Sequence, residues 1–302
     1  YDKIIDDYSK DLEYGAILQK SISNSSENII FENNKKRILK ASPALFRDEA
    51  GRISGAIVVF QDITESQRLE DMRREFVANV SHELKTPITT IKSYSETLLC
   101  GALEDKELSK SFVEVIENEA DRMSSLVKDL LQLSHMDYEK VVWEMHHLDL
   151  REIVTDSVRK LEVHFQNKNQ RLNMQISDEA VPIYADRGKI QQVIINLLTN
   201  AIKYTPENGN IRISAQVVDK NAIFEVQDSG IGIPKEDIKR IFERFYRVDK
   251  GRSRAQGGTG LGLSIAHNII KQHKGSIKVS SELEKGSIFT VYFPVDNSVD
   301  IL

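Results

Sequence analysis

The longest regular pattern in the chain lies between residues 64 and 135, where apolar residues recur at steps of three and four. This spacing places them on one face of a helix. The first stripe contains Leu69, Met72, Phe76, Val80, Leu84, Ile88, Ile91 and Leu98, and the second contains Leu108, Phe112, Val115, Glu119, Met123, Leu126, Leu130 and Leu133. A polar break around Gly101 separates them, so the pattern predicts two long helices joined as an antiparallel hairpin. Because one hairpin cannot cover both stripes, we expect a homodimer in which two hairpins form a four-helix bundle.

The regions on either side of the hairpin mix helical and strand patterns. Residues 1–63 begin with a polar helical stretch, Lys10–Lys20, and continue with three antiparallel strands at Asn28–Phe31, Arg37–Leu39 and Ile53–Phe60. In the C-terminal region we expect helices at Leu150–His164 and Lys189–Tyr204, and strands at Ile211–Val218, Ala222–Asp228, Ser276–Ser280 and Ser287–Phe293. The prediction is a multidomain α+β protein with domains at 1–63, 64–147 and 148–302, the last an α/β sandwich.

Composition narrows the class of protein. The 302 residues carry 41 Lys and Arg against 46 Asp and Glu, a net charge of −5, and 40% are hydrophobic. This is a globular composition, and its apolar runs are shorter than the roughly 18 residues of a membrane span. A pI near 5.9 gives no basic footprint for nucleic acid. The single cysteine, Cys100, excludes an internal disulfide framework and fits a reducing compartment. No signal peptide pattern precedes the first region, and a start at Tyr1 is expected of a piece of something longer.

The first candidate for chemistry is His82, within the run Ser-His-Glu-Leu-Lys-Thr-Pro at residues 81–87. It falls beside the apolar stripe of its predicted helix, where an ordinary histidine is a solvated side chain. The adjacent Glu83 favours a functional role, because a carboxylate can hold one ring nitrogen as N–H and leave the other as nucleophile or base. Pro87 removes a helical hydrogen bond at this point. A zinc site of the His-Glu-x-x-His type is excluded because its second histidine position is Thr86.

Two polar motifs follow in the C-terminal region. Asn196, Asn200 and Lys203 share one helix face by their spacing. Two amides and an amine suit a divalent cation with phosphate oxygens, although a solvated polar stripe has the same pattern. Asp228 then ends a predicted strand, where its carboxylate can accept a hydrogen bond from an exocyclic amine. The glycines after it, at residues 230 and 232, let a ligand approach the backbone closely, and an ordinary turn is the alternative.

The last motif is the glycine-rich run at residues 257–263, which precedes a predicted helix at Ser264–His273. Backbone amides at a helix N-terminus form a phosphate cradle. The run lacks the Gly-Lys-Ser/Thr of a Walker A loop, and no strand precedes it as in a Rossmann turn. The preceding basic segment is interpreted as a lid over an anion, or as a surface loop with ordinary charges. It contains Arg244, Arg247, Lys250, Arg252 and Arg254.

Taken together and in this order, the three C-terminal motifs predict one nucleotide pocket, and the chain as a whole resembles a bacterial sensor histidine kinase of two-component signalling. The resemblance is closest to the PhoR/WalK/ResE-like group and covers about residues 64–295. Residues 76–87 resemble the family's H-box, 189–204 its N-box, 228–234 its G1 box, 241–247 its F-box and 258–263 its G2 box. The resemblance implies a dimerisation and phosphotransfer hairpin followed by an ATP-binding domain of the gyrase, chaperone, kinase and mismatch-repair (GHKL) type.

The resemblance also implies roles for single residues. His82 is then the phosphoacceptor, Glu83 the general base, and Thr86 the residue that orients a water for hydrolysis of a partner's phospho-aspartate. Asn200 is the implied Mg²⁺ ligand, and Arg247 a phosphate contact. The implied nucleotide-binding set is Asn196, Asn200, Lys203, Tyr204, Asp228, Gly230, Gly232, Gly258, Thr259, Gly260, Leu261, Gly262, Arg252 and Arg254. The implied ligands are ATP and Mg²⁺.

Residues 1–63 resemble only the C-terminal part of a PAS sensor domain, ending in the Asp-Ile-Thr of residues 62–64. The implied partners are a second copy of the chain and a response regulator, with no nucleic acid. Relatives in this group imply a cytoplasmic portion of a membrane-anchored protein, attached through upstream segments. Two alternatives stay open: a GHKL ATPase that drives a clamp, and a scaffold or predominantly phosphatase protein.

Overall fold

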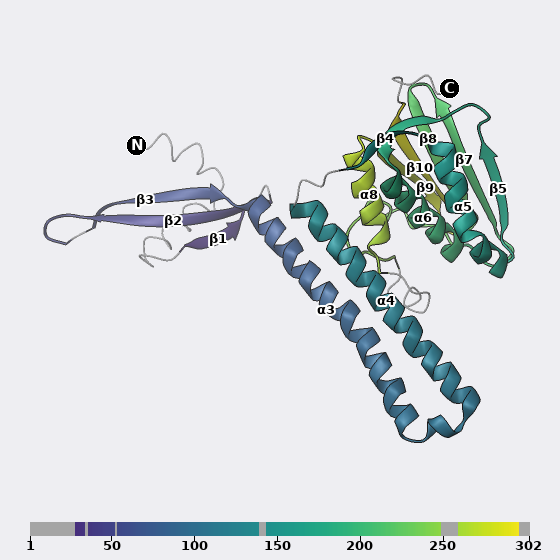
Figure 1. The fold of residues 1–302 in the computed structure, drawn as a ribbon. Coiled ribbons are helices and arrows are strands. Elements are labelled where there is room, and N and C mark those ends of the chain that lie inside the picture. Colours follow the sequence, from purple (N-terminus) through teal and green to yellow (C-terminus); the bar gives the residue numbers. More distant parts are fainter. Residues whose placement is uncertain (1–27, 34–35, 52, 139–142, 249–258, 296–302) are drawn as a thin grey trace. The chain divides into compact units, whose positions relative to one another are not determined.

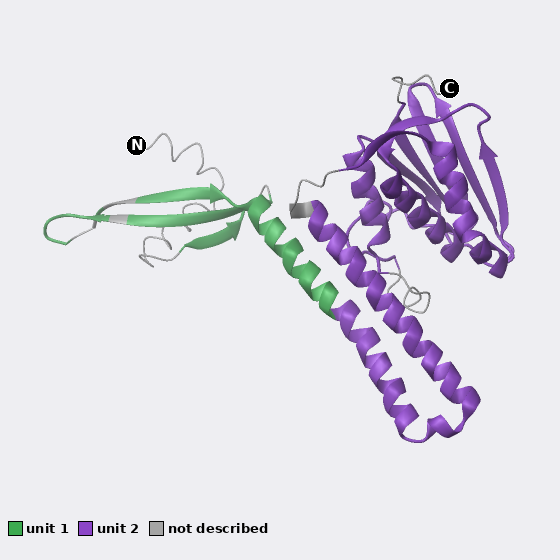
Figure 2. Ribbon diagram, in the orientation of Figure 1, with its two compact units in different colours: residues 1–81 green, residues 82–302 purple. Residues whose placement is uncertain are grey.

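The computed structural model describes residues 28–33, 36–51, 53–138, 143–248 and 259–295 (Figure 1). The chain divides into two compact units, residues 1–81 and 82–302 (Figure 2). The helix expected at Lys10–Lys20 lies outside the described residues. Among the described helices, none has the length and apolar character needed to cross a membrane.

The first unit contains the three predicted strands as one antiparallel sheet in the order β1-β2-β3. The strands are β1 (Ile29–Glu32), β2 (Ile38–Arg47) and β3 (Ile53–Asp62). The second strand is longer than predicted because it continues through Pro43. Pro43 lies two residues past Ala41, where the described pairing with β1 ends, and it faces Val58 of β3. Assignment of this sheet to a PAS-like domain stays a prediction.

Residues Asp62 and Thr64 form the junction between β3 and the first long helix. The amide and the hydroxyl of Thr64 both donate to Asp62 Oδ1, at 3.0 and 2.6 Å. These hydrogen bonds lower the pKa of Asp62. The Thr64 hydroxyl in turn accepts from the backbone N–H of Ile38, at 2.8 Å. The end of the sheet is thereby bonded to the first residue of the helix.

The helical hairpin is confirmed. It consists of α3 (Thr64–Leu99), the short 3₁₀ helix η1 (Ala102–Glu104) and α4 (Lys106–Tyr138). Asp105 caps α4, because its Oδ1 accepts from the amides of Glu107 and Leu108. Tyr94 and Phe112 meet edge to face across the two helices, with ring centroids 4.9 Å apart. The predicted break around Gly101 is therefore the turn of the hairpin.

The C-terminal part of the second unit is a five-stranded sheet beside three helices, which confirms the predicted α/β sandwich (Figure 1). The helices are α5 (Leu150–Asn167), α6 (Arg187–Tyr204) and α8 (Gly262–Gln272). The sheet order is β5-β7-β8-β10-β9, with strands β5 (Arg171–Ile176), β7 (Asn210–Val218), β8 (Asn221–Asp228), β9 (Ser276–Glu282) and β10 (Gly286–Pro294). β5 is parallel to β7, and the other neighbours are antiparallel.

Three strands were not predicted. β5 joins the sheet as an edge strand, and its alternation of Leu172, Met174 and Ile176 is the signal that marks it. β4 (Met145–Asp149) and β6 (Pro182–Asp186) form a separate two-stranded sheet. Each of these two is five residues long, and its partner lies more than thirty positions away. Such non-local pairing leaves little trace in a local pattern.

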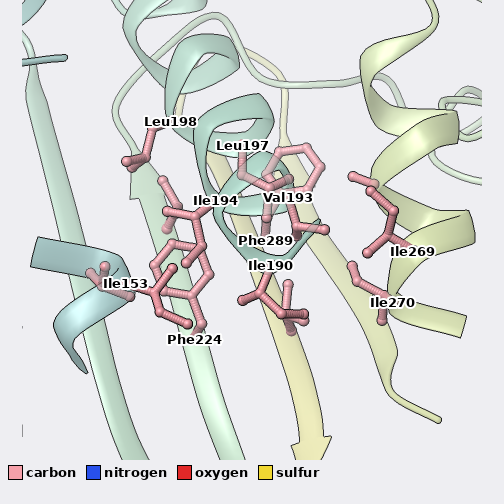
Figure 3. Packing of buried hydrophobic residues seen from close by; sticks show 14 of the residues in the cluster. Ile153, Ile190, Val193, Ile194, Leu197, Leu198, Phe224, Ile269, Ile270 and Phe289 are labelled. Atoms are coloured by element: carbon pink, nitrogen blue, oxygen red, sulfur yellow. The ribbon is translucent and has the colours of Figure 1, made fainter. Parts of the chain in front are cut away.

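The core of the C-terminal part lies between helices and sheet (Figure 3). α6 is its centre, because its residues Ile190, Ile194 and Leu197 are at most 1% exposed and its neighbours are α5 and α8 on either side. Phe224 of β8, on the sheet side, is 1% exposed. The helix that carries the polar residues of interest is thus held along its apolar face.

Replacing Phe224 with alanine is expected to lower the free energy of unfolding of the C-terminal part by about 3–5 kcal/mol, because a large cavity opens in the core. The fluorescence of Trp143, the only tryptophan in the sequence, reports the transition in denaturant, since its ring packs against His273 at 5.2 Å. Leu283→Ala is the control, because Leu283 is 56% exposed and its truncation should stay within about 0.5 kcal/mol of wild type. Equal losses in the two variants would contradict this description of the core.

Candidate functional site

His82 and Thr86 lie one turn apart on α3, and both side chains are exposed. The hydroxyl of Thr86 donates to the carbonyl oxygen of His82 at 3.2 Å. α3 continues through Pro87, which is buried. The imidazole is therefore accessible to a group that approaches from outside the hairpin.

Glu83, next to His82, contacts two arginines. Its Oε2 accepts from Nη2 of Arg122 on α4 at 3.2 Å, and its Oε1 is 3.6 Å from Nη1 of Arg247 in the C-terminal part. The side chains of Glu83 and Arg122 are 18% and 19% exposed, and that of Arg247 is 9% exposed. Within the described part of the chain, the residue beside His82 is thus joined by ion pairs to the other helix of the hairpin and to the C-terminal part.

The predicted polar face of α6 is present. Asn196 donates from Nδ2 to the carbonyl oxygen of Gly262 at 2.9 Å, which joins α6 to the start of α8. Asn200 follows one turn later and is half-buried. Lys203 lies close to the ring of Tyr204, with Nζ 4.9 Å from the ring centroid. Because α6 is helical from Arg187 to Tyr204, the spacing of these three residues places them on one helix face.

Burial acts on the charge of Lys203. It lowers the pKa of the ammonium group to about 8, and repulsion by Arg247 and Arg122 adds to the effect. Burial also raises the pKa of Tyr204, against the opposing influence of Arg247. Arg122, Lys203 and Arg247 therefore repel one another in this region. Such a concentration of positive charge favours the binding of an anion.

Asp228 ends β8 as predicted, and its side chain is buried. Burial raises the pKa of this carboxyl, although hydrogen bonds from the amides of Gly230 and Ser287 oppose the shift. Gly230 donates to Oδ1 at 2.8 Å. A Cβ at Gly230 would stand 2.6 Å from the carbonyl oxygen of Tyr204, so only glycine lets the loop after β8 lie against the end of α6. Gly232 follows in the same loop.

The glycine-rich loop packs against the residues before it. Gly260 accepts from the amide of Phe245 at 3.0 Å and has a φ of +72°, a conformation that favours glycine. Leu261 is fully buried, and its amide donates to the Thr259 hydroxyl at 3.3 Å. Gly258, Arg252 and Arg254 lie outside the described residues.

Two residues of α4 near these motifs were not singled out from the sequence. Arg122 contacts Glu83, as described above, and its Nη1 is 3.6 Å from Glu119 Oε2. Asp129 accepts from the hydroxyl of Thr259 at 3.2 Å, and burial raises the pKa of its carboxyl. The signal for Arg122 is present in the sequence, because Glu119 occupies a position of the apolar stripe where a charge needs a partner.

A cavity of about 410 Å³ lies outside this constellation, beside α5 and the start of α6. The charged groups that line it bond with one another. Arg151 Nη2 is 2.7 Å from Asp149 Oδ2, and Arg187 Nη2 is 2.7 Å from Asp156 Oδ2. These pairs tie α5 to its neighbours and leave little unsatisfied charge for a ligand.

Comparison with known families gives two matches. The family described as "His Kinase A (phospho-acceptor) domain" matches residues 72–139. The family described as "Histidine kinase-, DNA gyrase B-, and HSP90-like ATPase" matches residues 185–297. The first range contains most of the hairpin, including His82, and the second contains the motifs on α6, after β8 and before α8.

Curated relatives resemble the chain over most of its length. The sensor histidine kinase WalK of Bacillus subtilis is 39% identical over 269 residues, which are 88% of this chain and 44% of that protein. A sensor protein kinase WalK of Staphylococcus aureus is 36% identical over 284 residues, which are 92% of this chain and 67% of that protein. The chain spans about half the length of most of the curated relatives it matches.

Solved structures agree with these matches. The histidine kinase AdeS of Acinetobacter baumannii has 31% identity and a TM-score of 0.57, over 72% of this chain and 98% of that one. The histidine kinase ThkA, in complex with the response regulator protein TrrA, has 28% identity and a TM-score of 0.61, over 94% of this chain and 83% of that one.

The lowered pKa of Lys203 predicts a dependence of stability on pH. Its pKa is about 8 in the folded chain against an ordinary 10.5, so between these values the unfolded state binds more protons and the free energy of unfolding rises with pH. Wild type should gain stability relative to Lys203→Met across this window, as measured by urea unfolding at several pH values. Parallel curves for the two proteins would contradict the prediction.

Proposed function

The chain belongs to the sensor histidine kinase family, and on that premise we propose that it transfers the γ-phosphoryl group of ATP to His82. The phosphoryl group then passes to an aspartate of a response regulator. The competing assignment, a GHKL ATPase that drives a clamp, has no use for the hairpin that carries His82. The match of residues 72–139 to a phospho-acceptor domain favours the kinase.

One observation carries this proposal. The carboxylate of Glu83, adjacent to the exposed His82, is 3.6 Å from Arg247 of the C-terminal part. Burial lowers the pKa of Lys203 on α6, and repulsion by Arg247 and Arg122 lowers it further. The predicted phosphate-binding cations are thus close enough to the His-Glu pair to act on it electrostatically, as a transfer between nucleotide and histidine requires.

The residues present fit a nucleotide with a divalent cation. Asp228 is a buried acceptor at the end of β8, where it would receive the exocyclic amine of adenine. Lys203 would contact phosphate as a compact cation. No group of three or more His, Cys, Asp and Glu side chains among the described residues can hold a metal by itself. Mg²⁺ fits such a site, because it takes few protein ligands and completes its shell with water and phosphate oxygens; Asn200 would supply the amide oxygen.

In the proposed reaction a nitrogen of neutral His82 attacks the γ-phosphorus, and an N–P bond forms as the P–O bond to ADP breaks. The other ring nitrogen loses its proton to Glu83, which acts as general base. Lys203 and Arg247 offset the negative charge of the transferring phosphoryl group. Bound Mg²⁺ would supply further charge stabilisation at the phosphates.

The proposed partners are a second copy of the chain and a response regulator. The hairpin leaves large apolar side chains exposed on both helices, among them Ile88 at 51% and Leu131 at 57%. A second hairpin would cover such a stripe in a four-helix bundle. The solved complex of ThkA with a response regulator supports a regulator as the acceptor.

Incubation with γ-labelled ATP and Mg²⁺ tests the autokinase. Wild type should acquire label that is lost in acid and kept in alkali, and His82→Gln should acquire none, because the N–P bond forms at His82. Binding of a fluorescent nucleotide should be alike in both, since His82 lies on the hairpin. Label of equal amount in His82→Gln, or ATP turnover without label in wild type, would refute the proposal.

Thr86 supports a second activity, dephosphorylation of the same regulator. Its hydroxyl lies one helical turn from the exposed His82, where it can orient a water toward a docked phospho-aspartate. The substrate for the test is a receiver domain that has taken label from phospho-His82. Thr86→Ala should slow loss of that label about tenfold or more, and Thr86→Ser should keep it near wild type. If Thr86→Ala and Thr86→Ser lose the label at the same rate while autophosphorylation is intact, the hydroxyl of Thr86 does not have this role.

A further inference from the structure

A chain of alternating charges crosses the hairpin at the level of His82. It begins at Glu119 on α4, whose Oε2 is 3.6 Å from Arg122 Nη1. Arg122 Nη2 donates to Glu83 Oε2 at 3.2 Å, and Glu83 Oε1 is 3.6 Å from Arg247 Nη1. The four side chains are 9–24% exposed. The row therefore runs acid, base, acid, base, from one helix of the hairpin to the other and on to the C-terminal part.

The two arginines on Glu83 differ in where they come from. Arg122 lies on α4, in the same hairpin as Glu83, so this contact lasts as long as the hairpin is folded. Arg247 lies in the C-terminal part, and its contact requires that part to be docked on the hairpin. Each guanidinium engages a different carboxylate oxygen, Oε2 for Arg122 and Oε1 for Arg247. One oxygen is held from within the hairpin, and the other is held from outside it.

A general base must present one carboxylate oxygen to the imidazole in a fixed direction. A carboxylate held at one oxygen by a guanidinium group has less rotamer freedom left, so less ordering is needed in the transition state. Arg122 also reaches Glu119, which limits the movement of its guanidinium group. Its position is therefore set by the hairpin before any nucleotide arrives.

We propose that Arg122 is a positioning residue for phosphoryl transfer: it holds Glu83 at Oε2 so that Oε1 passes from Arg247 to the ring N–H of His82. This inference rests on the proposed function. When Arg247 moves onto the phosphates, Glu83 keeps one cationic partner, and its free oxygen accepts the proton that the imidazole gives up as the N–P bond forms. Arg122 touches neither the nucleotide nor His82 in this account.

The test compares Arg122→Gln, Arg122→Lys and wild type in autophosphorylation with γ-labelled ATP. Arg122→Gln should lower kcat about tenfold, which corresponds to about 1.4 kcal/mol in the barrier, and leave the KM for ATP and the binding of a fluorescent nucleotide within twofold. Arg122→Lys keeps one charged donor and should recover part of the rate. Lys110→Gln is the matched control on the same helix, because Lys110 is 79% exposed and its ion pair with Glu114 lies one turn along that helix.

A double-mutant cycle with Glu83→Gln separates positioning from a merely structural effect. If Arg122 acts through Glu83, Arg122→Gln should cost little further rate in the Glu83→Gln background. Transfer from phospho-His82 back to ADP passes through the same transition state and should slow by the same factor. Thermal unfolding tests whether each variant is folded. If Arg122→Gln does not fold, the same cycle is measured with Arg122→Lys.

Three outcomes overturn the inference: a wild-type kcat in Arg122→Gln, a raised KM with unchanged kcat, or an equal loss with and without Glu83. Each of these requires a wild type that takes up label, so it leaves the proposed function standing. A wild type that takes up no label refutes the proposed function, and the role of Arg122 with it.

Discussion

A carboxylate withdrawn from water needs cations beside it, and at Glu83 they come from two places in the sequence. Arg122 reaches it from the other helix of the hairpin. Arg247 reaches it from the segment between β8 and α8. The contact between Arg247 and Glu83 depends on the packing that holds the segment around Arg247. The amide of Phe245, two residues earlier, is bonded to Gly260, and Leu261 anchors that loop in the core. The packing of the sandwich thus places Arg247 beside Glu83.

Burial also shifts the pKa values of other charged groups of the site. Burial moves the pKa of Lys203 down to about 8 and that of Asp228 up, so both groups are held closer to neutrality than in water. A ligand that brings the opposite charge or a matching donor relieves this cost. Because charges interact more strongly where water is excluded, the site favours a phosphate and an amine together. Preorganised charge of this kind is the main contribution that a protein makes to phosphoryl transfer.

Sequence patterns predicted most of the fold because its main elements are long and locally periodic. The hairpin of α3 and α4, the helices α5 and α6, and strands β7, β8 and β10 follow from spacing alone. β4 and β6 were not predicted, because a five-residue strand that pairs across more than thirty positions leaves little local signal in the sequence. His82 stood out through its neighbours in the chain. Arg122 was not singled out. Glu119 in the apolar stripe indicates a cationic partner, but the contact of Arg122 with Glu83 depends on the register of α3 against α4.

Two kinds of contact along α4 determine how the C-terminal part docks on the hairpin. Leu126 and Leu133 are buried and belong to the core of the C-terminal part, and such apolar burial supplies most of the free energy of the contact. Between and beside them, Gln132 and Gln192 exchange hydrogen bonds of 2.8 and 2.7 Å, and Asp129 accepts from Thr259. Each polar pair contributes only about 0.5–1.5 kcal/mol net, but leaving either member buried and unpaired costs about 1–3 kcal/mol. A slip of one turn would break every pair at once. The polar pairs therefore select one docking position of the domain, and it is this position that brings Arg247 to Glu83.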